Sequence, residues 1–251
     1  MRCHFTCLRA SFYLLGLAAS LDAAGAEKPR EGDHSVIKFS AEGIPLTLPA
    51  IPGYGRLDGI LDELDQGFQK VAGASGLEVL VVLAPDSDIS TARSGQIPPM
   101  KQKIFIQRNA KVSGKLLAKE FHKLRDGFAV EAEATKTRTK DETVEGREKA
   151  INEAVSYLEV NPKKRRIKTP EMLGFFGEDE SSFCYAMLAS HTIGNPGEGV
   201  KLKSNVVCLA FVKVSGTVVF VSVNTPFENK KSMDWAMKMT KQVRDSLLGR
   251  R

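Results

Sequence analysis

The residues best suited to chemistry are two cysteines, Cys184 and Cys208, in the apolar, strand-like runs SSFCYAMLAS and SNVVCLAFV. A turn-rich segment around Pro196-Gly197 joins these runs, so a hairpin would place the cysteines opposite each other. In an exported protein such a pair permits one disulfide. Two free thiols buried on neighbouring strands are the alternative. A catalytic thiol is not expected, because an apolar strand raises the pKa of a thiol and no cation lies nearby in the sequence.

The histidines beyond the first 26 residues form no metal-binding motif. His34, His122 and His191 are widely separated and occur in no H-x-x-x-H or H-E-x-x-H frame, so no metal site is predicted. Three aspartates share one predicted helix: Asp58, Asp62 and Asp65. The helical period places them on its solvent side, which indicates a solvated face rather than an acid–base pair. The sequence therefore names no catalytic residue, although a site built from dispersed residues stays open.

Two short stretches imitate catalytic motifs without their structural context. In GNPGEGVK (194–201), Val200 separates the last glycine from the lysine and a strand follows, whereas a P-loop lysine directly follows the glycine and opens a helix. We therefore predict a hairpin loop and no nucleotide cofactor. SVIK (35–38) has the S-x-x-K spacing of serine acyl-enzymes, but an extended segment turns positions three apart to opposite faces. We interpret it as a chance match.

The stretch NPKKRRIK (161–168) carries the densest positive charge of the chain. A nuclear or nucleic-acid-binding signal is one interpretation of such a run. A solvated loop after a helix that ends near Val160 is a second, because cations complement a helix C-terminus and Pro162 stops the helix. The third is contact with an anionic surface. Its contact residues would be Lys163, Lys164, Arg165, Arg166 and Lys168.

The first 26 residues resemble a signal peptide. Arg2 and Arg9 form a positive segment, Ala10 to Leu21 carry no charge, and Ala24-Gly25-Ala26 supplies the small residues of a cleavage site. We expect cleavage between Ala26 and Glu27 and a periplasmic or secreted location. The apolar core is too short to anchor the chain in a bilayer, and the mature protein is expected to be soluble. An exported chain would not meet genomic DNA, which argues against nucleic acid as a partner.

Composition predicts a single domain over residues 27–251. The chain has 251 residues, 42% hydrophobic residues and a net charge of +6, typical of one mildly basic globular domain. We expect strands at 36–39 and 44–48, a helix from Leu57 to Val71 closed by Gly73 and Gly76, a doubly covered strand at 77–85 and a strand at 103–108. A helix is expected to begin near Ser113, and residues 131–146 are expected to extend it or to be mobile. Helical spacing returns at 150–158.

The pattern of the last third of the sequence predicts three strands and a helix. Strands are expected around 182–191, 205–214 and 217–223, with a Ser215-Gly216 turn between the last two. Ser232 is expected to cap a terminal helix whose first turn contains Asp234. Its apolar stripe comprises Met233, Ala236, Met237, Val243 and Leu247, flanked by Trp235 and Met239. The element order predicts an α+β fold in which a mainly antiparallel sheet is packed by helices.

The C-terminal run resembles secreted bacterial proteins of unknown function in which a hairpin leads through a V-x-x-P-[FY] corner to a D-W helix. The matching residues are Val223, Pro226, Phe227, Asp234 and Trp235. The resemblance implies a PsbP-like α/β/α sandwich in the cell envelope, and it brings no active-site residues.

These observations lead to three hypotheses about function. The first is a non-enzymatic binding or accessory module in the envelope, whose partner is an unknown envelope protein or an anionic surface. The second is a small periplasmic hydrolase in which His122 or His191 works with a carboxylate. The third is a structural or interaction protein that pairs through sheet edges or residues 131–146.

Overall fold

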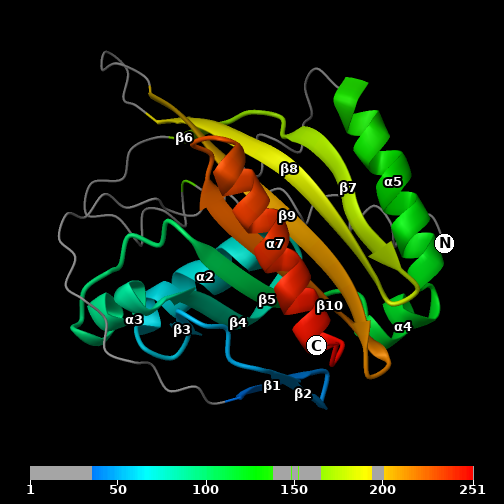
Figure 1. Ribbon diagram of the computed structural model, residues 1–251, viewed down its shortest axis with the longest axis horizontal. Coiled ribbons are helices and arrows are strands. Elements are labelled where there is room, and N and C mark those ends of the chain that lie inside the picture. The colour runs from blue at the N-terminus through cyan, green and yellow to red at the C-terminus, as the bar shows by residue number, and fades with distance from the viewer. Residues whose placement is uncertain (1–35, 138–147, 149–151, 153–164, 194–200, 251) are drawn as a thin grey trace.

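A computed structural model describes residues 36–137, 148, 152, 165–193 and 201–250. Its centre is an antiparallel eight-stranded sheet with the strand order β3-β4-β5-β10-β9-β8-β6, and β7 also pairs with β8 (Figure 1). A separate two-stranded hairpin, β1-β2, precedes it in the chain. The α+β prediction is confirmed.

The described elements follow the expected order with three additional strands, while the helix expected at 150–158 lies almost wholly outside the described residues. The strands are β1 (Ile37–Ala41), β2 (Ile44–Leu48), β3 (Tyr54–Arg56), β4 (Leu77–Pro85), β5 (Lys103–Asn109), β6 (Arg165–Ile167), β7 (Glu171–Asp179), β8 (Ser182–Ile193), β9 (Lys201–Val214) and β10 (Thr217–Pro226). The helices are α2 (Asp62–Ala74), α3 (Asp86–Arg93), α4 (Gly114–Lys119), α5 (Phe121–Thr137) and α7 (Lys230–Leu247). The sequence pattern did not predict β3, β6 or β7.

Helices cover both faces of the sheet. On one face, α2, α3, α4 and α5 bury apolar residues against β4, β5, β8, β9 and β10. On the other face, α7 and the β1-β2 hairpin close a second apolar cluster (Figure 1). Strands β4 and β10 therefore face apolar layers on both sides, which explains why both read as nearly continuous runs of apolar residues. The molecule is an α/β/α sandwich.

The two tight turns that the sequence indicates are present. Glu42 and Gly43 have φ angles of 53° and 77°, and Ser215 and Gly216 have 48° and 78°. Two consecutive positive φ values match the twist of an antiparallel hairpin, and glycine adopts the second one without strain.

Helix α2 begins later than its apolar period predicts. The period includes Leu57, but the helix starts at Asp62 because Gly59 interrupts the chain at φ +85°. The segment that precedes it starts beside the sheet, where the Leu57 N–H donates to the Val82 carbonyl at 2.8 Å, and then turns at Gly59. Apolar spacing alone does not distinguish the first turn of a helix from a segment that packs beside it.

The NPKKRRIK stretch is not simply a charged loop. Arg165–Ile167 form edge strand β6, which pairs with the C-terminal end of β8, and the Lys168 N–H donates to the Ser190 carbonyl. The loop interpretation is therefore wrong for these residues. Cations are common on edge strands because they discourage pairing with another sheet. Residues 161–164 lie outside the described part of the chain.

The cap of α7 differs from the prediction. Asn229, not Ser232, is the N-cap, and its side chain accepts from the Lys231 N–H at 2.8 Å. Ser232 is the third helical residue, and its hydroxyl accepts from the Asn229 N–H at 3.2 Å, which completes a capping box. The buried stripe also includes Met239 and Thr240, while Met233 and Met237 are only partly buried.

The expected signal peptide and its Ala26–Glu27 cleavage site lie outside the described residues, so they stay predictions. Residues up to Thr137 extend α5, which matches one of the two expectations for 131–146, and 138–146 are outside the described part. None of the helices in the described ranges has the length and apolar composition needed to span a bilayer.

We expect Asp179 to make stability depend on acid pH. Partial burial acts to raise its pKa, but hydrogen bonds from Arg250, the Ser181 N–H and Ser182 outweigh burial and lower it to about 2. A depressed carboxyl pKa stabilises the folded state above the unfolded value near 4, and this contribution disappears as pH falls from about 4 to 2. Asp179→Asn should therefore lower the melting temperature at pH 7, by an amount that shrinks towards pH 2. A difference that stayed constant across this range would contradict the assignment.

Candidate functional site

The two cysteines lie diagonally on neighbouring strands. Cys184 on β8 is opposite Ala210, and Cys208 on β9 is opposite Ala186, so the register offsets them by two residues. Both are free, buried thiols in this structure. Burial raises the pKa of Cys208 to about 12, and it also raises that of Cys184 although Arg244 Nη1 donates to its sulfur at 3.6 Å. Neither thiol has the low pKa that nucleophilic catalysis requires.

The histidines are not brought together. His122 is exposed on α5 and His191 is buried near the end of β8, while His34 lies outside the described residues. Among the described residues no group of three or more His, Cys, Asp or Glu side chains could hold a metal ion. The hydrolase hypothesis thus gains no assembled acid–base pair from these two histidines.

One of the three aspartates departs from its predicted environment. Asp58 precedes α2, and its Oδ1 accepts from the Val82 N–H at 2.8 Å, beside the irregularity in β4. Asp65 accepts from the Gly59 N–H at 2.8 Å, and burial, followed by the nearby Asp58 and Asp62, raises its pKa. The solvated-face interpretation is therefore wrong for Asp58, whose side chain binds the segment before α2 to strand β4.

The two motif imitations also have structural outcomes. Ile37 and Lys38 of SVIK lie in β1, an extended strand, which excludes the helical turn that an S-x-x-K site needs. Residues 194–200 of GNPGEGVK lie outside the described part. Ile193 and Lys201 on either side of them pair across β8 and β9, so this segment connects two antiparallel strands.

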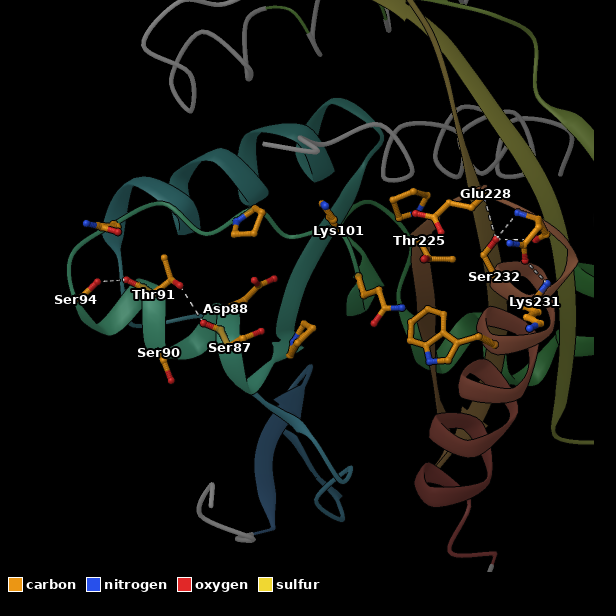
Figure 2. A pocket seen from close by; sticks show the side chains of 17 residues that line it. Ser87, Asp88, Ser90, Thr91, Ser94, Lys101, Thr225, Glu228, Lys231 and Ser232 are labelled. Carbon is orange, nitrogen blue, oxygen red and sulfur yellow. Dashed lines mark hydrogen bonds between the residues drawn. The ribbon is translucent and has the colours of Figure 1, made fainter. Parts of the chain in front are cut away.

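Among the described residues, the feature best suited to bind a ligand is a cleft of about 1080 Å³ between α3 and the start of α7 (Figure 2). One wall is α3 with the segment that follows it, and the other wall is the end of β10 with the first turns of α7. We call it the α3–α7 cleft. Polar side chains dominate the lining, which consists of Pro85, Ser87, Asp88, Ser90, Thr91, Ser94, Gln96, Pro99, Lys101, Gln102, Thr225, Pro226, Glu228, Asn229, Lys231, Ser232 and Trp235.

The α3 wall is held firmly against the sheet. Asp86 and Asp88 in its first turn complement the helix dipole, and Ile89 and Ala92 bury its inner side. Ile89 reaches so close to β3 that a Cβ added to Gly55 would lie 3.0 Å from it. Glycine in β3 therefore permits the close packing that fixes this wall.

A buried ionic group fixes the floor of the cleft. Asp88 is 6% exposed and accepts a hydrogen bond from the Met100 N–H, while Lys103, 4% exposed, donates to the Met100 carbonyl at 3.4 Å. Met100 has a φ of 45°, a conformation that side chains other than glycine rarely adopt. Burial raises the pKa of Asp88, and Met100, Lys103 and Lys101 counteract that rise. These contacts hold the segment 99–102 in one conformation.

Tyr54 connects the two walls. Its hydroxyl donates to Gln102 Oε1 at 2.8 Å, and its ring stacks on Trp235 with a centroid distance of 6.4 Å. Burial, and then the charge of Asp88, raise the pKa of Tyr54, so the phenol stays protonated and remains a donor at neutral pH. Strand β3 thus contributes to the site although it has only three residues.

Four hydroxyl groups of the cleft donate hydrogen bonds to the backbone. Ser90, Thr91 and Ser94 each donate to a carbonyl of α3, at 2.7 to 3.0 Å. Ser232 donates to the Asn229 carbonyl at 2.7 Å (Figure 2). The described lining contains no histidine or cysteine that would act as a base or nucleophile. The hydroxyl oxygens of Ser90, Thr91 and Ser94 keep lone pairs that can accept hydrogen bonds from a ligand.

Sequence reasoning did not find this cleft. Its walls are far apart in the chain, and its serines and threonines resemble ordinary turn residues. The signals that were present are Trp235, the sole tryptophan, and a lysine, Lys103, directly before the apolar run Ile104-Phe105-Ile106.

Comparison with known proteins gives only structural neighbours. No protein-family model and no curated protein sequence matches the chain. The structure of a single-residue mutant of the protein Mog1 is 13% identical, with a TM-score of 0.35, and the match covers 85% of this chain and 92% of that one. The Ran-binding protein Mog1p of Saccharomyces cerevisiae is also 13% identical, with a TM-score of 0.31, covering 86% and 92%. At these scores neither match supports an inference about a ligand or partner.

The comparisons correct one prediction. A periplasmic or secreted location was expected, but the solved structures that match are of Mog1, one of them a yeast Ran-binding protein, and they do not support such a location. The location is therefore withdrawn. The resemblance to secreted bacterial proteins is not tested by these matches and stays a prediction.

Proposed function

We propose that this protein is a non-enzymatic binding module that takes a segment of a partner protein in the α3–α7 cleft. The observation that carries the proposal is the cleft itself, a large recess lined mainly by residues that can form hydrogen bonds and closed below by a preorganised floor. Small-molecule pockets are usually enclosed and about 300–1000 Å³ in volume. An open recess of about 1080 Å³ has room for a polypeptide segment.

The chemistry of the walls fits a polypeptide backbone. Carbonyl-bound hydroxyls on α3 keep their lone pairs for the N–H groups of a ligand, and Gln96 provides both a donor and an acceptor. The half-buried Trp235 offers an aromatic face of the kind that is enriched in protein interfaces. Lys101 and Lys231 place an exposed cation on each wall. Of the two lining carboxylates, Asp88 is buried and Glu228 is exposed, so the exposed charge is positive on balance and would favour acidic residues in the bound segment.

Site-directed photocrosslinking tests this proposal. A benzoylphenylalanine at Gln96 or Lys231 should capture the same protein from an extract of the source cells, because these residues lie on opposite walls. The same group at Lys111 or Lys119, both exposed and outside the lining, should not capture it. The purified partner should then change the fluorescence of Trp235, which is the only tryptophan of the chain.

Two results would refute the proposal. One is capture that is as efficient at Lys111 and Lys119 as at the cleft positions, or no capture at either wall. The other, where a partner is captured at the cleft alone, is that its binding leaves Trp235 fluorescence unchanged and is not weakened by Lys101→Glu/Lys231→Glu. We expect this double variant to weaken binding about tenfold or more, since like charges introduced at an interface repel an acidic segment.

A further inference from the structure

We propose that the ends of β6, β8 and β9 form a second binding surface, directed at an anionic lipid bilayer. These strand ends lie beyond the N-terminal end of α7, near the label β6 in Figure 1. We call them the basic tip, defined as residues 165–168, 190–193 and 201–204. The proposal does not depend on the α3–α7 cleft.

The basic tip has one sign of charge. The segments RRIK, SHTI and KLKS contain five lysines and arginines and no acidic residue. The register places them side by side, because Arg166 pairs with Thr192, which in turn pairs with Leu202. The connecting residues 194–200 are outside the described part and carry one acid, Glu198. A cluster of this kind attracts anionic headgroups at short range.

An exposed apolar side chain lies between these charged residues. Leu202 is 58% exposed between Lys201 and Lys203, and its register position faces the same side as that of Arg166. Phe227, 42% exposed, is adjacent, since its N–H donates to the Ser204 carbonyl at 2.8 Å. Exposed apolar residues flanked by cations are the combination that binds at the headgroup boundary of a bilayer.

The exposed cations lie on both sides of the basic tip. Lys201 precedes Leu202 in strand β9, so alternation turns it to the opposite face of the sheet, while Arg166 shares the face of Leu202. A tip that is positive on both faces contacts a broad anionic surface more readily than it encloses one polypeptide segment. We therefore assign the anionic bilayer, and an acidic polypeptide becomes an outcome of the test.

Vesicle co-sedimentation tests the basic tip. The full chain should bind phosphatidylcholine vesicles that contain about 30% phosphatidylserine, should bind pure phosphatidylcholine much less, and should dissociate as salt rises. At about fivefold per cation, Arg166→Gln/Lys168→Gln/Lys201→Gln should lower binding on the order of 100-fold. Leu202→Ser should lower it at least about threefold.

Matched variants separate this site from general basicity. Lys111→Gln/Lys115→Gln/Lys119→Gln removes three exposed cations elsewhere, and Leu116→Ser replaces a leucine that is 43% exposed. Both should bind phosphatidylserine vesicles as the parent does. The proposal fails if the parent protein does not bind the phosphatidylserine vesicles, or if the Lys111→Gln/Lys115→Gln/Lys119→Gln control loses as much binding as the basic-tip triple variant. It also fails if soluble polyglutamate, at equal charge concentration, displaces the protein fully from the vesicles. The last result would assign the tip to an acidic polypeptide.

Discussion

Replacing Phe211 with alanine is expected to lower the free energy of unfolding by about 3–5 kcal/mol. Phe211 on β9 is fully buried and stacks on Phe183 at a centroid distance of 4.2 Å. Phe128 and Phe220 meet its ring edge-on, at 5.0 and 5.2 Å. Truncation would remove the shared member of this aromatic cluster and leave a cavity that β8 and β10 cannot collapse, because both are held by the sheet.

A matched truncation separates the cavity from the loss of an aromatic ring. Phe227→Ala removes the same atoms at a position that is 42% exposed, and it should change stability by no more than about 0.5 kcal/mol. Denaturant unfolding of both variants at neutral pH measures the difference. If Phe211→Ala cost less than about 1 kcal/mol, or no more than Phe227→Ala, the packing of β9 described above would be incorrect.

Strands were predictable where burial alternates or where both faces are covered. The β4, β9 and β10 runs are apolar because helices or the hairpin cover both of their faces. Strand β7 was missed because two irregularities, near Gly174 and Gly177, break its period of two. Gly174 also has a φ of 115°, which a regular strand does not contain. Strands β3 and β6, of three residues each, are too short to show a period.

The candidate site was less predictable than the fold because none of its parts is a local pattern. Asp88 resembles an ordinary surface residue in the sequence. Lys103 stands out because it directly precedes an apolar run, but only the structure shows that both side chains contact the Met100 peptide. The contact of Tyr54 with Trp235 crosses most of the chain. By contrast, the sequence shows the positive charge of NPKKRRIK directly. It does not show that Arg165–Ile167 pair with β8 or that they lie near Leu202.

Gly114→Ala is expected to lower the free energy of unfolding by about 3 kcal/mol, the upper part of the range for overpacking. Gly114 begins α4 and lies directly over the start of β10. A Cβ at this position would collide with Thr217 Oγ1 and would lie only 3.1 Å from the Val218 backbone nitrogen. Thr217 is 1% exposed and cannot move aside, so α4 itself would have to shift.

The same substitution at Gly73 should have the opposite sign. Gly73 lies inside α2, its φ is not positive, and a Cβ there would meet no atom within 4 Å. Gly73→Ala should therefore stabilise the protein by about 0.5–1 kcal/mol through the higher helix propensity of alanine. Thermal or denaturant unfolding of the pair gives two shifts of opposite direction. Equal shifts would contradict the close approach of α4 to β10 that this structure shows.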